Sequence, residues 1–313
     1  MAMKAIVTGA GGFIGSHIVD SCLAKGVDVV ATVHEKTSNL DHAKGKIKIV
    51  EIDVADKEKI EKLIASEKPD YIFHYAAQSF VMPSWADPEK TVNSNIKGTL
   101  NILEAVRKNN LNPVIILACS SAAYGLNYPD EIPIKESKEF RPSSPYAVSK
   151  AATDYLGFAY WRAHGLRIIR LRIFNTIGPR KTGSAIADWS QQVAEIEKGK
   201  RKELSVGSIE STVDFTDIKD HIDAVWTLSE KGKWGEAYNI CSGTGRKMKD
   251  VLDSITRLAK VPVKVVQDPS RIRPGDDPIF VGDNTKLRSL GWKPKVAFED
   301  TLKETLNWWR SRQ

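Results

Sequence analysis

The chain has 313 residues, enough for one large domain or two closely packed ones, and its 42% hydrophobic and 27% charged residues are ordinary for a globular protein. Its net charge of +7 is spread along the sequence, and the densest basic cluster, residues 198–202, contains no aromatic residue. No apolar stretch is long enough to span a bilayer, so these features exclude a disordered chain, a coiled coil and a membrane protein, and they argue against nucleic acid as a partner.

The cysteines indicate a reducing compartment. Cys22, Cys119 and Cys241 are odd in number, lie far apart, and form neither a CxxC motif nor a cluster with histidine. We therefore expect free thiols, no metal site and a cytoplasmic location. The first residues lead directly into a strand-like segment without the charged and apolar regions of a secretory signal, so no such signal is expected.

Up to about residue 175, apolar runs alternate with amphipathic stretches, which is the pattern of βαβ units around a parallel sheet. The predicted strands are residues 4–8, 28–32, 47–52, 71–75, 114–118 and 167–171. The predicted helices between them are residues 13–25, 57–67, 88–109 and 145–164.

Beyond residue 175 the pattern becomes mixed. Helices are predicted at residues 186–198, 217–230, 247–259 and 298–311, and short strands at residues 204–206, 237–241 and 263–266. The sequence Arg-Pro-Gly-Asp-Asp-Pro at residues 273–278 predicts a loop. We interpret this part as a smaller C-terminal lobe, and a cleft between two lobes is a usual place for a ligand.

A glycine-rich segment follows the first strand and opens the first helix. Its spacing, GxxGxxG, permits a tight turn and the close approach of a pyrophosphate, which the N–H groups and positive dipole end of the helix also favour. In this position the motif predicts a dinucleotide site. Its expected contacts are Gly9, Gly11, Gly12, Phe13, Ile14 and Gly15.

The fold class that follows is α/β: a Rossmann-like, doubly wound parallel sheet with a smaller mixed α/β lobe for the substrate. We expect the cofactor-binding domain to be residues 1–178 and the substrate lobe residues 179–313. Segments near residues 217–241 are expected to return to the first domain.

The end of the second strand indicates which dinucleotide binds. An acidic residue there favours NAD, while basic residues accommodate the 2′-phosphate of NADP. Here Val33 occupies the expected acidic position, and His34 and Lys36 follow it. We therefore expect NADP(H), with NAD(H) as the alternative that Glu35 keeps open.

Asp53 and Val54, after the third strand, are also expected cofactor contacts. The carboxylate of Asp53 has two candidate roles. It can accept a hydrogen bond from the adenine amino group, or it can cap the helix that starts near residue 56.

Tyr146 and Lys150 are the expected catalytic pair, because residues four apart share one face of a helix. A lysine ammonium one turn away favours the phenolate and lowers the pKa of the tyrosine, which can then exchange a proton with a carbonyl or hydroxyl group. Ser120, at the end of the buried strand 114–118, is expected to hydrogen-bond the reacting oxygen. Alternatively, Tyr146 and Lys150 are a surface pair, and Ser120 only satisfies loop backbone.

In this order the motifs resemble those of the extended short-chain dehydrogenases/reductases, in the branch that modifies nucleotide sugars. The resemblance covers almost the whole chain and includes residues 74–78, 95–99 and 172–180. It implies that Tyr146 and Lys150 also hold the cofactor. It further implies cofactor contacts at Ala76, Ala77, Gln78 and Asn95, of which Ala76, Ala77 and Asn95 alternatively brace the active-site strands. It places Ser121 and Asn175 at the substrate.

The C-terminal segments 214–220, 235–243 and 271–276 look like those of the group formed by GDP-mannose 4,6-dehydratases and GDP-4-keto-6-deoxymannose reductases. By this resemblance Arg273 binds the substrate diphosphate with its guanidinium fork, and Arg180 and Asp276 are further substrate contacts. Alternatively, Arg273 pairs with Asp276 or Asp277 at the surface.

The sequence departs from this group at three positions. Ala122 stands where the dehydratases carry a carboxylate, so elimination of water lacks an expected acid or base. Val213 stands where an arginine often contacts phosphate, which leaves Arg180, Lys181 or Arg246 to compensate, and Thr176 replaces a histidine that is common in the reductases.

The resemblance therefore predicts an NADP-dependent oxidoreductase that reduces the 4-keto group of a GDP-linked 4-keto-6-deoxyhexose. The alternatives are an NAD-dependent nucleotide-sugar 4-epimerase, then a 4,6-dehydratase, and last a non-catalytic NADP-binding protein. The resemblance also implies a homodimer, with the predicted helices 88–109 and 145–164 as its candidate interface.

Overall fold

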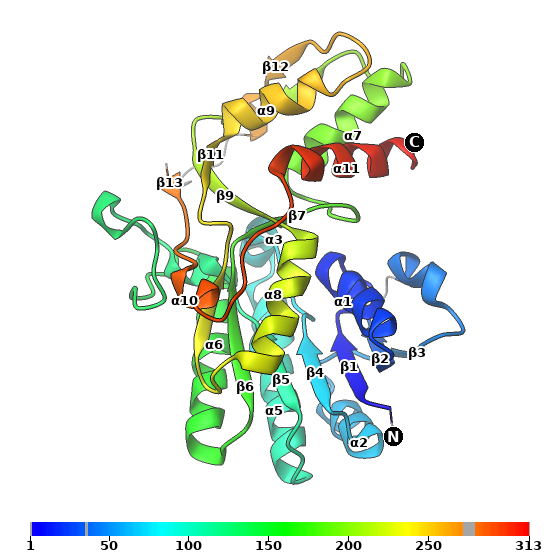
Figure 1. Ribbon diagram of the computed structural model, residues 1–313, viewed down its shortest axis with the longest axis vertical. Helices are drawn as coiled ribbons and strands as arrows, with labels where there is room; N and C mark the ends of the chain where they lie inside the picture. Colours follow the sequence, from blue (N-terminus) through cyan, green and yellow to red (C-terminus); the bar gives the residue numbers. More distant parts are fainter. Residues whose placement is uncertain (1, 35–36, 272–278, 313) are drawn as a thin grey trace.

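The computed structural model describes residues 2–34, 37–271 and 279–312. Its centre is a parallel sheet of seven strands in the order β10-β6-β5-β4-β1-β2-β3, as the lower half of Figure 1 shows. The strands are β1 (Lys4–Thr8), β2 (Asp28–Val33), β3 (Lys48–Glu51), β4 (Tyr71–His74), β5 (Val114–Ala118), β6 (Ile168–Ile173) and β10 (Ala237–Ile240). The chain runs outward from β1 to β3 and then back past β1 to β4, which is the doubly wound order predicted from the sequence.

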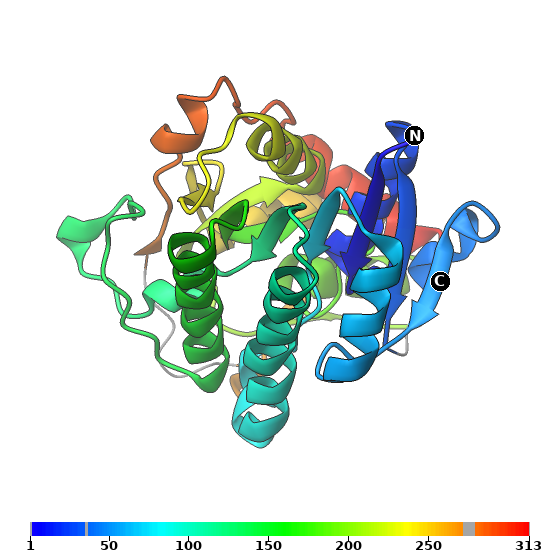
Figure 2. The ribbon, with the colours of Figure 1, turned by 90° about the horizontal axis from the view of Figure 1, so that it is seen from below.

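Helices cover both faces of this sheet (Figure 2). Helices α1 (Phe13–Ala24) and α8 (Ile218–Lys231) cover one face, and α2 (Lys57–Glu67), α5 (Gly98–Lys108) and α6 (Pro145–His164) cover the other. Because both faces are buried, consecutive residues of a strand are apolar: Ile6 packs toward one layer and Val7 toward the other.

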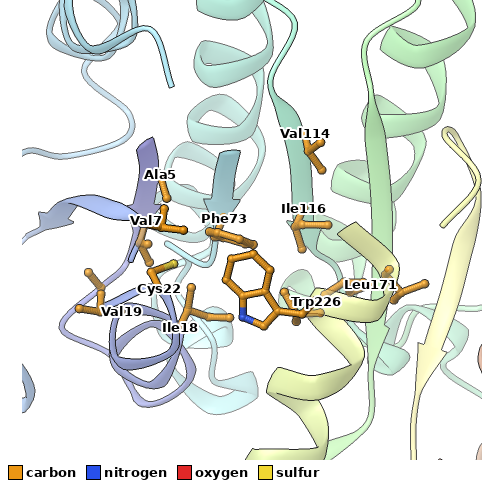
Figure 3. Close-up of a cluster of buried hydrophobic side chains, with 14 of the residues drawn as sticks. Ala5, Val7, Ile18, Val19, Cys22, Phe73, Val114, Ile116, Leu171 and Trp226 are labelled. Atoms are coloured by element: carbon orange, nitrogen blue, oxygen red, sulfur yellow. The ribbon is translucent and has the colours of Figure 1, made fainter. Parts of the chain in front are cut away.

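The packing on the first face centres on Trp226 of α8 (Figure 3). Its ring lies 5.6 Å from the ring of Phe73 on β4, in an edge-to-face arrangement, and Ile18 of α1 lies beside it. The indole N–H donates to Ser21 Oγ at 2.7 Å. The burial of one large aromatic side chain therefore joins α1, α8 and the sheet.

The predicted helix 88–109 is not continuous. It is divided into α4 (Pro88–Val92), a π-helical turn at Asn93–Lys97 and α5, and a short helix α3 (Val81–Ala86) precedes it. Gly98 follows the π turn and packs so closely on Val54 that a Cβ atom would lie 2.6 Å from Val54 Cγ2. The wide turn thus lets α5 approach the loop after β3, a contact that no local pattern encodes.

A second region, which we call the small-sheet region, lies above the carboxyl ends of the large sheet in Figure 1. Its strands are β7 (Asn175–Ile177), β8 (Leu204–Val206), β9 (Thr212–Asp217), β11 (Gly245–Lys247), β12 (Val265–Gln267) and β13 (Ile279–Phe280). Its helices are α7 (Ala185–Glu197), α9 (Met248–Arg257) and α11 (Phe298–Arg310), which share one hydrophobic cluster. Strands β7, β9, β11 and β13 were not predicted, and the predicted loop 273–278 lies outside the described residues.

Short elements complete the described chain: the helix α10 (Thr285–Arg288) and the short 3₁₀ helices at Ser38–Ala43, Ser121–Tyr124, Pro129–Glu131 and Pro269–Arg271. After β9 the chain returns to the large sheet through α8 and β10, and β10 pairs with β6. None of the described helices is both long enough and apolar enough to cross a bilayer.

Candidate functional site

A cleft of about 1940 Å³ lies where the carboxyl ends of the large-sheet strands face the small-sheet region. In doubly wound sheets, ligands bind at this edge. The cleft brings together most of the residues predicted for the site. Those that line it are Gly9, Gly11, Gly12, Phe13, Ile14, Gly15, His34, Asp53, Val54, Ala76, Ala77, Gln78, Ser120, Ser121, Tyr146, Lys150 and Asn175.

The glycine loop needs its glycines. Gly9 has φ +67°, and a Cβ atom there would lie 2.7 Å from the backbone nitrogen of Ala76. At Gly15 a Cβ atom would collide with the carbonyl oxygen of Gly9, so the first turn of α1 packs directly on the loop. The backbone is therefore open toward the cleft at the N-terminus of α1, which fits the diphosphate of a dinucleotide.

A directed chain of hydrogen bonds holds this loop against the neighbouring strands. Thr99 donates to the carbonyl of Asn95 at 2.6 Å, so its oxygen accepts from His74 Nε2 at 3.0 Å. His74 Nδ1 then accepts from Thr8 Oγ1 at 2.7 Å, and Thr8 accepts from the N–H of Ala76 at 3.2 Å. Burial lowers the pKa of His74 to about 3, which keeps the ring neutral as this chain requires.

Asn95 is not one of the described residues that line the cleft. It supports the site through hydrogen bonds to residues around it. Its side-chain oxygen accepts from the N–H of Gln78 at 2.8 Å, and its amide donates to the carbonyl of Gln78 at 2.9 Å and to Ser149 Oγ at 2.8 Å. The residue stands in the π-helical turn. It therefore ties the loop after β4 to α6.

At the end of β2, Val33 is buried and His34 is exposed at the cleft, while Lys36 lies outside the described residues. The suggestion that Asp53 caps α2 is wrong, because Asp56 is the N-cap and accepts from Lys59 N–H at 3.1 Å. Asp53 instead lines the cleft and accepts from the N–H of Ala55 at 2.9 Å.

Tyr146 and Lys150 lie in the first two turns of α6. Ser144 caps this helix by accepting from the N–H of Ala147 at 3.1 Å, and Pro145 occupies the first turn. The hydroxyl of Tyr146 hydrogen-bonds Ser120, which follows β5, and Lys150 Nζ donates to the carbonyl of Ala118 at 2.6 Å. The end of β5 therefore positions both side chains of the predicted pair, so they are not a surface pair.

The pKa values of Tyr146 and Lys150 differ from those expected from the sequence. Burial raises the pKa of Tyr146, although the hydrogen bond from Ser120 acts in the opposite direction. Burial also lowers the pKa of Lys150 to about 8. The predicted lowering of the tyrosine pKa by Lys150 is not seen, because desolvation of the Tyr146 side chain dominates and the Lys150 ammonium donates to the carbonyl of Ala118.

Ser120 also accepts from the N–H of Ala122 at 3.1 Å, so it caps the loop after β5 as well as bonding Tyr146, and its role toward a reacting oxygen stays a prediction. Asn175 lines the cleft, and its amide lies 3.5 Å from the carbonyl of Asp214. Arg180 does not line the cleft, because it pairs with Asp20 of α1 at 2.8 Å. The predicted contacts Arg273 and Asp276 lie outside the described residues.

Sequence reasoning missed several residues that line the cleft. Asp188 of α7 pairs with Arg271 at 2.6 Å, and 83 residues separate them, so no local pattern links the two. His221 of α8 bridges Tyr75 at 3.1 Å and Thr176 at 2.9 Å behind the cleft wall. The exposed apolar residues Val81, Met82 and Trp85 line the cleft mouth, and their run in the sequence is a signal that could have been noticed.

The sequence model of the family described as GDP-mannose 4,6 dehydratase matches residues 6–305. The chain therefore belongs to this family of extended short-chain dehydrogenases/reductases. It is 30% identical to a GDP-6-deoxy-D-mannose reductase from Pseudomonas aeruginosa, over 100% of this chain and 99% of that one.

Two solved structures are similar along the whole chain. RMD from Pseudomonas aeruginosa in complex with NADPH has a TM-score of 0.87 and 28% identity, and the match covers 100% of both chains. UDP-glucose 4-epimerase from Thermus thermophilus in complex with NAD has a TM-score of 0.89 and 28% identity, covering 99% of this chain and 100% of that one. The neighbours thus support a nicotinamide cofactor, and they include both a reductase and an epimerase.

Proposed function

We propose that this protein is an NADP-dependent oxidoreductase that reduces the 4-keto group of a GDP-linked 4-keto-6-deoxyhexose. The observation that carries the proposal is the grouping of Ser120, Tyr146 and Lys150 at the end of β5, in the cleft that the glycine loop also lines. The similarity to a reductase of a GDP-linked deoxysugar along the full length of the chain supports the choice of substrate.

In the proposed reaction the nicotinamide, when bound, supplies the hydride. Tyr146 donates its proton to the carbonyl oxygen, and its raised pKa suits a residue that enters the reaction protonated. Ser120, which bonds the tyrosine hydroxyl, is placed to hydrogen-bond the same oxygen. Lys150, held by the carbonyl of Ala118, stabilises the phenolate that forms when the proton leaves.

The lining of the cleft disfavours a dehydratase. Ala122, two residues after Ser120, faces the cleft and carries no acid or base. An epimerase remains the second candidate, because the similar UDP-glucose 4-epimerase has a TM-score of 0.89 to this chain.

The preference for NADP(H) rests on Val33 at the end of β2, where a carboxylate would repel a 2′-phosphate, and on His34 beside it at the cleft. Titration of the purified protein with NADPH and NADH by fluorescence tests this preference. Tighter binding of NADPH is expected, and the reverse order would refute it.

We also propose that residues 1–178, with the returning segment 217–241, form the cofactor domain and that residues 179–313 hold the substrate.

We further propose a homodimer formed through α4, α5 and α6. Val92, Leu100, Val148, Tyr155 and Phe158 on these helices are exposed large hydrophobic residues, which supports that interface. A cytoplasmic location is also part of the proposal, and the three free, buried cysteines support it.

The deciding experiment incubates the enzyme with GDP-, UDP- and dTDP-linked sugars and their 4-keto derivatives, with and without NADPH. Mass spectrometry of the products separates the candidates. A gain of two hydrogens on the GDP-linked keto sugar is expected for the reductase. An unchanged mass with a new sugar indicates an epimerase, and loss of water indicates a dehydratase.

A further inference from the structure

The segment 178–184 connects β7 to α7 and runs along α1, the helix that the glycine loop opens. Two contacts fasten it there. His17 Nε2 lies 3.0 Å from the carbonyl oxygen of Pro179, and Arg180 pairs with Asp20 at 2.8 Å. The segment is therefore held at fixed positions on α1.

A tight turn in this segment separates two neighbouring cations. Arg180 has φ +72°, and the N–H of Lys181 donates to the carbonyl of Gly178 at 3.3 Å. Arg180 consequently reaches the side of α1, while Lys181 lines the cleft. The ammonium of Lys181 lies 5.2 Å from the ring centroid of Phe13, the first residue of α1.

The charge of Lys181 is not offset by the described part of the chain. No described carboxylate lies within ion-pair distance of its ammonium, whereas Arg180 beside it has such a partner. Burial lowers the pKa of Lys181, and burial together with Lys181 lowers the pKa of His221 to about 3. A cation that faces a ligand cleft without an anion is a site for an anionic ligand group.

We propose that Lys181 binds the diphosphate of the dinucleotide from the side opposite the glycine loop. The N-terminus of α1 and the Lys181 ammonium then hold the same anion between them, because Phe13 is the first residue of α1 and its ring contacts the ammonium. This inference rests on the proposed cofactor. The proposed sugar-nucleotide substrate also carries a diphosphate, and the inference assigns Lys181 to the diphosphate of the cofactor.

The test compares the wild-type protein with Lys181→Gln, Lys181→Arg and the control Lys200→Gln, which removes an exposed lysine after α7. Binding of NADPH is measured by fluorescence, and binding of ADP-ribose, GDP and UDP by calorimetry. Loss of a charge-assisted hydrogen bond is expected to weaken NADPH and ADP-ribose binding about ten- to hundredfold in Lys181→Gln. Lys181→Arg recovers most of the affinity, Lys200→Gln keeps it, and GDP and UDP bind as in the wild type.

Two outcomes would overturn the inference while leaving the proposed function intact. In one, Lys181→Gln binds NADPH and ADP-ribose as well as the wild type does. In the other, it loses affinity only for GDP or UDP, which would assign Lys181 to the substrate diphosphate. If the wild-type protein binds neither NADPH nor NADH, the proposed function itself fails, and the inference fails with it. Thermal unfolding of each variant checks that the fold is kept.

Discussion

The large sheet and the small-sheet region each bury a carboxylate, and the two carboxylates are satisfied differently. Asp154 of α6 is fully buried and pairs with Arg170 and Arg172 of β6. Asp214 of β9 is also fully buried, but it accepts from Ser242 Oγ at 2.6 Å and from the N–H groups of Ser242, Gly243 and Gly282 at 2.8, 2.9 and 3.3 Å.

The difference shows how each region is held together. Beside α6, one buried carboxylate pairs with two arginines of an adjacent strand, so removing Asp154 leaves two buried cations without this anion. In the small-sheet region, one carboxylate accepts hydrogen bonds from the backbone of two loops, which lie 28 and 68 residues away along the chain. Burial raises the pKa of Asp214, because the desolvation of its carboxylate outweighs the hydrogen bonds from Ser242, Gly243 and Gly282 that act in the opposite direction.

The largest expected effect concerns Tyr146, in the proposed active site at the carboxyl end of the large sheet. In the proposed reaction Tyr146 donates the proton that the carbonyl oxygen receives, so we expect the turnover of Tyr146→Phe to fall about hundred- to ten-thousandfold. NADPH affinity is expected to stay within a factor of about two, since the ring remains. Steady-state kinetics and NADPH titration check both, and turnover close to that of the wild type would remove Tyr146 from the mechanism.

Asp154→Asn tests the buried ion pairs that Asp154 forms with Arg170 and Arg172. The substitution leaves the buried Arg170 and Arg172 without an anion, so we expect a loss of about 3–5 kcal/mol in the free energy of unfolding. The matched control is Asp41→Asn, which breaks an exposed pair with Lys44 and is expected to cost less than about 1 kcal/mol. Urea unfolding measures both, and similar losses for the two variants would contradict the comparison.

Asp214→Asn tests the carboxylate held by backbone groups. An amide replaces one accepting oxygen, so a loss of about 1–3 kcal/mol is expected at neutral pH. The pKa of Asp214 is raised in the folded protein, so the folded state keeps this proton more tightly than the unfolded state. The stability of the wild type relative to Asp214→Asn is therefore expected to fall as pH rises above 3.8 toward the raised pKa. A relative stability that rises over this window would refute this account.

The smallest effect is expected at Glu104 of α5, which accepts from Arg107 at 2.8 Å and from Tyr160 of α6 at 2.7 Å. Arg107 and Tyr160 lower the pKa of Glu104 to about 2. Glu104→Gln is expected to cost less than about 1 kcal/mol at neutral pH, because water screens the pair. The lowered pKa means that this difference disappears as pH falls from 4.5 to about 2, the opposite direction to Asp214, and urea unfolding across that range measures it. A difference that persists at the acidic end would contradict the assigned cause.

Local patterns predicted the large sheet well. The bounds of β1 and β5 agree with the predicted residues 4–8 and 114–118, and the start and end of α6 agree with 145–164. Strand β9 escaped prediction because Asp214 and Asp217 interrupt its apolar pattern, and their burial depends on partners elsewhere in the chain. The π-helical turn at Asn95 was missed for a similar reason, since its bonds to Gln78 and Ser149 are long-range.

By itself, the sequence determined the glycine loop, the placement of Tyr146 and Lys150 on one helix, and the serine at the end of β5. These features depend on local spacing, and a helix or a tight turn has the same geometry wherever it lies. Only the tertiary structure decided that burial raises the pKa of Tyr146, that Asp56 caps α2, and that Arg180 turns to Asp20 while Lys181 faces the cleft. Desolvation and ion pairing depend on which distant residues surround a group, and only the folded chain brings those residues together.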